Sequence, residues 1–210
     1  DGYFTYHREA QTMLEECGVP SALVPFGYED DAMTEPFVHE NQEVLRGCFI
    51  GNPNPLRVRF LKQLEGRIPI DLFGNNWAQH FGKSPNIQVH GAVHDNAHWK
   101  TMAKYRFQLN MMAEHNPNAH NMRTFSAPAA GAILVAPRSS DHDRFFEDGK
   151  EALLYDSVDD CIQRCDALLR MTFQMALEIR IAARKRSLDS GYSYAERARV
   201  MLEHMLKSTN

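Results

Sequence analysis

The sequence lacks the features that mark membrane-spanning, secreted and nucleic-acid-binding proteins. Its 210 residues contain no apolar run of the roughly 18–20 residues that a membrane-spanning helix needs, so we expect no transmembrane segment. The first residues carry no initial methionine and no basic stretch followed by an apolar one. They therefore predict a piece of a longer protein and no signal peptide. The net charge is -4, which argues against a nucleic-acid partner because such partners select basic surfaces.

Common nucleotide and metal motifs are also missing. There is no G-x-G-x-x-G and no G-x-x-x-x-G-K-[ST] motif, so neither a standard dinucleotide site nor a P-loop is predicted. Cys161 and Cys165 lie four apart in a predicted helix, where joined thiols or half a metal site are possible. We favour small buried side chains in a reducing compartment. His90, His94 and His98 invite a metal site, but the strand pattern at His90 keeps them off one helical face, so we predict no metal there.

Strand and helix patterns alternate along most of the chain. Hydrophobic residues make up 43% of the sequence, which is enough for a sizeable core. Predicted strands cover residues 3–6, 22–26, 44–50, 68–73, 87–90, 105–110, 132–136 and 153–155. Predicted helices cover residues 7–17, 57–64, 96–104, 122–130, 158–169, 171–187 and 194–207. From residue 44 onward this alternation predicts a doubly wound, Rossmann-like α/β fold, in which helices flank both faces of a parallel sheet.

The stretch from residue 27 to residue 43 interrupts this pattern. It is acidic, contains Pro36 and has no hydrophobic period, so it predicts a linker or crossover between two units. We therefore divide the chain into residues 1–35, a short strand–helix–strand unit with the linker, and residues 36–210, the Rossmann-like domain.

Ligands of a parallel sheet bind in the crevice beyond the carboxyl ends of its strands. The loops that follow the predicted strands are residues 51–55, 73–77, 90–98 and 110–123. Gly51 and Gly74 would let a ligand approach the backbone closely. The nearby side chains that could reach a phosphate are Asn52, Arg57 and Arg59, although a solvated helix start accounts for them equally well. Trp77 fits either the core or a platform under a ligand.

The stretch from residue 120 to residue 137 gives the strongest indication of a bound ligand. It predicts a polar loop, a helix of small residues, a glycine turn and an apolar strand. The start of such a helix presents free backbone N–H groups and the positive end of the helix dipole, which is typical of a phosphate site. Arg123 can pair with a phosphate through two parallel hydrogen bonds, the alternative being a surface arginine. The other residues that we assign to this anion site are Asn118, His120, Asn121, Met122, Thr124 and Ser126.

Ser139, Asp141 and His142 are the residue types of a hydrolytic site. No nucleophile elbow surrounds the serine, however, so hydrolysis is the weaker alternative. We expect these three residues to belong to a solvated loop and helix start.

Four blocks of sequence carry a resemblance to a known family. They are Tyr-Arg-Phe-Gln-Leu-Asn at 105–110, Met-Arg-Thr-Phe-Ser-Ala-Pro-Ala-Ala-Gly-Ala at 122–132, Phe-Phe-Glu-Asp-Gly-Lys-Glu-Ala-Leu-Leu-Tyr at 145–155 and Tyr-Ser-Tyr-Ala-Glu-Arg at 192–197. In these blocks the chain resembles the C-terminal half of glycosyltransferases of the GT-B fold, most closely the CgeB-like (spore maturation protein) type. The resemblance covers nearly the whole chain. It implies that residues 1–35 are a remnant of the N-terminal domain plus a linker, and that residues 36–210 are the nucleotide-sugar-binding C-terminal domain.

The resemblance implies metal-independent transfer of a sugar from a nucleotide-sugar donor to an acceptor, which is a glycan, a protein or a small molecule. The donor is a substrate, and no cofactor is implied. The anion site would hold the donor diphosphate, and His94 or His98 would contact the base. Such enzymes bind the acceptor mainly through the N-terminal domain, so the chain alone is expected to be inactive. The resemblance identifies no catalytic residue within this chain.

One position departs from the family pattern. Many retaining members have a glutamate that holds the donor ribose where this chain has Ser126, and a second glutamate where this chain has Asn118. The alternatives are therefore a non-catalytic nucleotide- or partner-binding module and a sugar-nucleotide epimerase of similar fold. We expect a cytoplasmic protein, with a peripheral membrane location as a further possibility.

Overall fold

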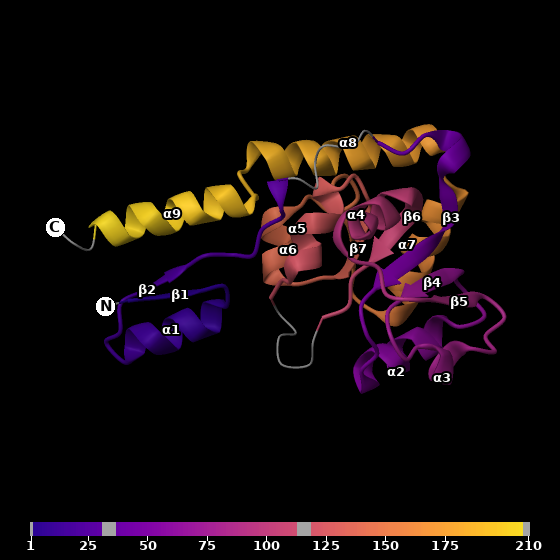
Figure 1. Ribbon diagram of the computed structural model, residues 1–210, viewed down its shortest axis with the longest axis horizontal. Coiled ribbons are helices and arrows are strands. Elements are labelled where there is room, and N and C mark those ends of the chain that lie inside the picture. The colour runs from indigo at the N-terminus through magenta and orange to yellow at the C-terminus, as the bar shows by residue number, and fades with distance from the viewer. Residues whose placement is uncertain (1, 31–36, 113–118, 208–210) are drawn as a thin grey trace.

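The structure is a computed structural model that describes residues 2–30, 37–112 and 119–207 (Figure 1). Its main feature is a six-stranded sheet with the strand order β5-β4-β3-β6-β7-β8, in which every neighbouring pair is parallel. The strands are β3 (Val44–Ile50), β4 (Ile70–Phe73), β5 (Ile87–His90), β6 (Tyr105–Leu109), β7 (Leu134–Pro137) and β8 (Leu153–Tyr155). The predicted α/β fold with a parallel sheet is confirmed.

Helices cover both faces of this sheet. The helices on one face are α2 (Pro55–Leu64), α3 (Ala78–Phe81) and α7 (Val158–Arg170), and those on the other are α4 (Asp95–Lys104), α5 (Met122–Ala129) and α6 (Ser140–Phe145). Neighbouring residues of one strand point to opposite cores, as Phe49 and Ile50 do in β3. This burial on both faces explains why the strands read as apolar runs and not as alternating patterns.

A smaller unit lies at one end of the molecule. It consists of β1 (Tyr3–Thr5), α1 (Arg8–Glu16) and β2 (Ser21–Leu23), and the two strands pair in parallel. The long helix α8 (Phe173–Asp189) is followed by α9 (Tyr194–Lys207), which runs back to this unit (Figure 1). The rings of Phe4 and His204 lie 6.1 Å apart. The predicted boundary between residues 35 and 36 lies outside the described residues, so the division into two domains stays a prediction.

Three short elements were not predicted from the sequence. They are α3, α6 and a 3-10 helix (Glu40–Gln42) within the predicted linker. Each is too short to show a hydrophobic period. Asp141 and His142 do lie at a helix start, as expected, but the expectation that they are solvated is wrong, because both side chains are buried in α6. The Ser139 hydroxyl caps this helix by accepting a hydrogen bond from the backbone N–H of His142.

Two predictions about single side chains are resolved by burial. Trp77 is fully buried and belongs to the core, so it is not a ligand platform. Cys161 and Cys165 are both fully buried in α7 with free thiols, as expected for small core residues. In the described part of the chain, no helix is both long and apolar enough to cross a membrane.

Candidate functional site

The loops after β3 and β4 are tied together at the carboxyl edge of the sheet. The backbone N–H of Gly51 donates to the carbonyl of Phe73 (2.8 Å), and the indole N–H of Trp77 donates to the carbonyl of Gly51 (2.7 Å). The Asn52 side chain accepts a hydrogen bond from the backbone N–H of residue 75 (2.9 Å). A Cβ atom at Gly74 would clash with the Gly51 carbonyl. Gly74 is therefore needed for this close approach, whereas a Cβ atom at Gly51 would clash with the Arg123 guanidinium.

Two arginines converge on this pair of loops. The guanidinium groups of Arg57, from α2, and Arg123, from α5, lie 5.3 and 5.0 Å from the centre of the Phe49 ring. Arg57 donates to the carbonyl of Asn52 (2.8 Å) and Arg123 donates to the carbonyl of Ile50 (2.8 Å). No carboxylate of the described residues pairs with either arginine.

The electrostatics of this pair favour a bound anion. Burial, together with the positive charge of Arg57, lowers the pKa of Arg123 to about 10. Burial also lowers the pKa of Arg57, and the Nε atom of Arg57 is buried without a hydrogen-bond partner. An anion placed between the two groups would relieve both costs, because opposite charges favour the protonated arginines.

Helix α5 begins beside Arg123 with a reciprocal cap. The Asn121 side chain accepts from the backbone N–H of Thr124 (3.3 Å), and the Thr124 hydroxyl accepts from the backbone N–H of Asn121 (3.2 Å). These bonds satisfy two N–H groups at the helix start. The N–H groups of Met122 and Arg123 remain at its open end. The free donors of the predicted anion site are therefore backbone groups and the arginine, while Asn121 shapes the helix.

Two of the predicted site residues lie inside the protein. Thr124 is fully buried, and its hydroxyl lies 3.0 Å from the Nε2 atom of His142. Ser126 is 4% exposed. Burial lowers the pKa of His142 to about 4, so this imidazole is neutral near pH 7. Thr124 and Ser126 lie in the same helix as Arg123, behind the exposed helix start.

His94 and His98 lie near Arg123. His94 is the exposed N-cap of α4, and His98 is half-buried one turn further along. Burial lowers the pKa of His98, and the charges of Arg123 and His94 lower it further. The structure thus brings His94, His98 and Arg123 into one neighbourhood. The sequence predicts that His94 or His98 contacts the base of the donor whose diphosphate Arg123 holds, and this assignment stays a prediction.

His120 connects the smaller unit to the main domain. Its Nδ1 atom lies 2.6 Å from Asp141 and its Nε2 atom accepts a hydrogen bond from the backbone N–H of Phe26 (3.1 Å). His120 is fully buried, and burial lowers its pKa although Asp141 raises it. This residue therefore holds two segments together, which differs from the predicted phosphate contact. Asn118, the other predicted donor in this loop, lies outside the described residues.

The alternative hydrolytic and metal sites find little support. The Ser139 hydroxyl lies 2.9 Å from the Nδ1 atom of His142, but both side chains are buried and the serine caps α6. A substrate would have no access to this hydroxyl. Within residues 2–30, 37–112 and 119–207, no three His, Cys, Asp or Glu side chains form a group that could hold a metal ion.

The parallel sheet flanked by helices places the chain in the class of doubly wound α/β proteins, with Arg57 and Arg123 at the carboxyl edge of the sheet. Within that class, the chain belongs to the glycosyl transferase-like family, whose sequence profile matches residues 57–203. No curated protein matches the chain in sequence.

Solved structures with the same fold include several glycosyltransferases. A TarM mutant from S. aureus, in complex with fondaparinux, α-GlcNAc-glycerol and UDP, has a TM-score of 0.70 at 13% identity over 96% of this chain and 43% of that one. Anabaena HepE, in complex with UDP-glucose, has a TM-score of 0.72 at 11% identity over 97% of this chain and 63% of that one. A glycosyltransferase from Rickettsia africae has a TM-score of 0.70 at 13% identity over 97% and 62%. The chain thus spans between 43% and 63% of the length of these relatives.

Proposed function

We propose that this chain is the donor-binding part of a glycosyltransferase that transfers a sugar from a nucleotide-sugar without a metal ion. The observation that carries the proposal is the pair of half-buried arginines, Arg57 and Arg123, beside the open start of α5. Sugar transfer breaks the bond between the sugar and the diphosphate, so negative charge develops on the diphosphate oxygen that leaves. Two guanidinium groups and free backbone N–H groups are suited to stabilise that charge.

The remaining predicted residues receive distinct roles in this proposal. Gly51, Asn52 and Gly74 form the floor against which the diphosphate lies, because Gly74 lets the two loops approach each other and Gly51 leaves room for the Arg123 guanidinium. His94 or His98 contacts the nucleoside. Asn121 and Thr124 hold the start of α5 in place, Met122 contributes its backbone N–H, and Ser126 stands where the family resemblance implies a ribose-binding acid. The acceptor would bind mainly to a part of the protein outside residues 36–210.

Calorimetric titration with a panel of nucleoside diphosphates tests the proposal. UDP is the first to try, because UDP or UDP-glucose is bound in the similar structures of TarM and HepE. Replacing Arg123 with glutamine should weaken binding about 10- to 100-fold, because a hydrogen bond to a charged group contributes about 1.5–3 kcal/mol. The matched control is Arg67→Gln, which removes an exposed arginine paired with Asp159.

The possible results of this titration are decisive. If no nucleoside diphosphate binds, the transferase proposal is wrong. If one binds equally well to the Arg123→Gln variant, with unchanged thermal unfolding, the assignment of the diphosphate to this crevice is wrong.

Ser126 favours a second candidate function. A buried serine in place of an acid removes the charged contact to the ribose, which suits a non-catalytic nucleotide- or partner-binding module. An epimerase that acts on a nucleotide-sugar would use the same crevice. As part of the glycosyltransferase proposal, we also assign the chain to the CgeB-like type. We place it in the cytoplasm, with or without peripheral contact to a membrane. Nucleotide binding without hydrolysis or transfer by the full-length protein would favour the binding module.

A further inference from the structure

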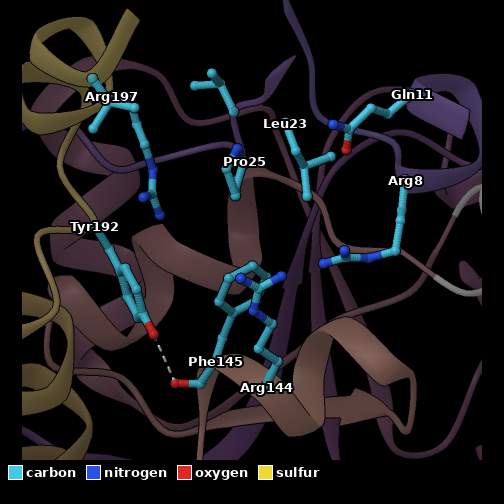
Figure 2. A pocket seen from close by; sticks show the side chains of 10 residues that line it. Arg8, Gln11, Leu23, Pro25, Arg144, Phe145, Tyr192 and Arg197 are labelled. Carbon is cyan, nitrogen blue, oxygen red and sulfur yellow. Dashed lines mark hydrogen bonds between the residues drawn. The ribbon is translucent and has the colours of Figure 1, made fainter. Parts of the chain in front are cut away.

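A cationic pocket lies apart from the candidate donor site around Arg57 and Arg123. It has a volume of about 470 Å³ and is formed where the smaller unit faces α6 and α9 (Figure 2). Its size falls within the range of roughly 300–1,000 Å³ that is usual for small-molecule sites. Arg8 comes from α1, Arg144 from α6 and Arg197 from α9, so elements from both ends of the chain contribute.

The charge of this pocket is uncompensated. Figure 2 shows the side chains of Arg8, Arg144 and Arg197 extending toward the same space. Among the residues that the structure describes, no aspartate or glutamate lines the pocket. Among the described residues, none of the three arginines forms an ion pair, whereas Arg138 alone pairs with three carboxylates. Three unpaired arginines in one pocket are unusual for a chain whose net charge is -4.

Arg197 is held in position by its neighbours, and its guanidinium group retains a hydrogen-bond donor without a partner. Its guanidinium lies 5.5 Å from the centre of the Phe125 ring and 5.3 Å from that of Tyr192, and its Nε atom donates to the carbonyl of Phe26 (3.3 Å). Its Nη2 atom is buried without a hydrogen-bond partner. A buried donor without a partner costs free energy, which a bound oxygen would recover.

We propose that this pocket binds the phosphate group of a second ligand, separate from the donor nucleotide. Three guanidinium groups offer more donors than the two oxygens of a carboxylate accept, whereas a phosphate monoester presents three charged or partly charged oxygens. The pocket is larger than the phosphate needs, so it also has room for the organic group that carries it. The binding of this phosphate does not rest on the proposed function.

The two cationic sites share helix α5. Arg123 faces the donor crevice at the start of this helix, and Phe125, two residues later, lies under Arg197. His120 contacts the ring of Phe145 in the pocket wall (5.2 Å) and directly precedes Asn121, the N-cap of α5. A ligand in the pocket would therefore lie on the far side of α5 from the donor diphosphate. Both ligands would lie beside residues of this one helix.

Calorimetric titration with glucose 6-phosphate tests this site. The double variant Arg8→Gln/Arg144→Gln should bind at least tenfold more weakly than the unmodified chain. Both side chains are exposed, so the fold should tolerate the change. Arg170→Gln is the charge control, since it removes an exposed arginine paired with Asp166. Arg123→Gln is the site control and should leave glucose 6-phosphate binding within twofold.

Each outcome of this experiment has one meaning. Loss of binding in the double variant alone supports the proposal. No binding to the unmodified chain, or equal binding by the double variant, overturns it. Glucuronate binding as tightly as glucose 6-phosphate overturns the selection of phosphate over carboxylate. Because UDP is titrated separately against Arg123→Gln, failure of UDP to bind would overturn the proposed function while leaving this site standing.

Discussion

At the scale of single residues, the candidate donor site depends on two glycines, Gly51 and Gly74, that have no side chain. Gly74 has a φ of +153°, and Gly51 has a φ of +152°. The missing side chain at Gly74 leaves room for the Gly51 carbonyl, which accepts a hydrogen bond from the indole of Trp77, and the missing side chain at Gly51 leaves room for the Arg123 guanidinium. The floor under Arg57 and Arg123 therefore depends on two hydrogen atoms in place of two methyl groups.

Replacing Gly74 with alanine tests this dependence. The added Cβ would clash with the backbone carbonyl of Gly51 and would hold a φ that side chains disfavour. We expect a loss of about 2–4 kcal/mol in the free energy of unfolding, combining backbone strain and overpacking, and loss of UDP binding. The control is Gly149→Ala, which has a φ of +79° but open space around it. It should cost only about 1–2 kcal/mol. Equal losses in urea unfolding would show that the close approach of the loops is unimportant.

At the scale of elements, the buried strands and the longer helices could be predicted from the sequence and the short helices could not. The pattern of residues 44–50 and 87–90 identifies β3 and β5 with their observed bounds, because strand character is local. The six residues of α6 show no period, and what holds them is the Ser139 cap and the burial of His142. The pairing of Arg57 with Arg123 over Phe49 was also beyond sequence reasoning, since it depends on how α2 and α5 meet across β3.

The buried His142 between α5 and α6 predicts a pH dependence of stability. Burial lowers its pKa from 6.5 to about 4 in the folded protein. The unfolded chain therefore binds a proton more readily, and stability falls as the pH drops from 6.5 towards 4. We expect this residue to account for about 3 kcal/mol of that loss, at 1.36 kcal/mol per pKa unit. Urea unfolding at pH 7 and pH 4 should show a smaller loss for His142→Gln than for the unmodified chain. The exposed His39→Gln should behave like the unmodified chain, and an identical loss in all three would contradict the assignment.

At the scale of the whole molecule, long-range ion pairs fix the segment that leads into the main sheet. Glu43 precedes β3, and its side chain is 3% exposed. It accepts two hydrogen bonds from Arg106 in β6 (3.0 and 2.6 Å) and one from Arg180 in α8 (2.7 Å). The sequence around Glu43 is acidic and reads as a linker, because its partners lie 63 and 137 residues further along the chain. Only the folded chain reveals that this carboxylate holds the middle of the sheet to a helix.

Replacing Glu43 with glutamine should be among the most destabilising single changes in the protein. The variant would leave two buried guanidinium groups without a counter-charge, and breaking a buried pair from one side costs about 3–5 kcal/mol. The matched control is Glu147→Gln, whose carboxylate pairs with Lys150 at the surface (2.9 Å). An exposed pair of this kind contributes about 0–1 kcal/mol. Urea unfolding measures both. A loss below 1 kcal/mol for Glu43→Gln would mean that water or another acceptor compensates Arg106 and Arg180. In that case the entry into β3 would be held by backbone pairing alone.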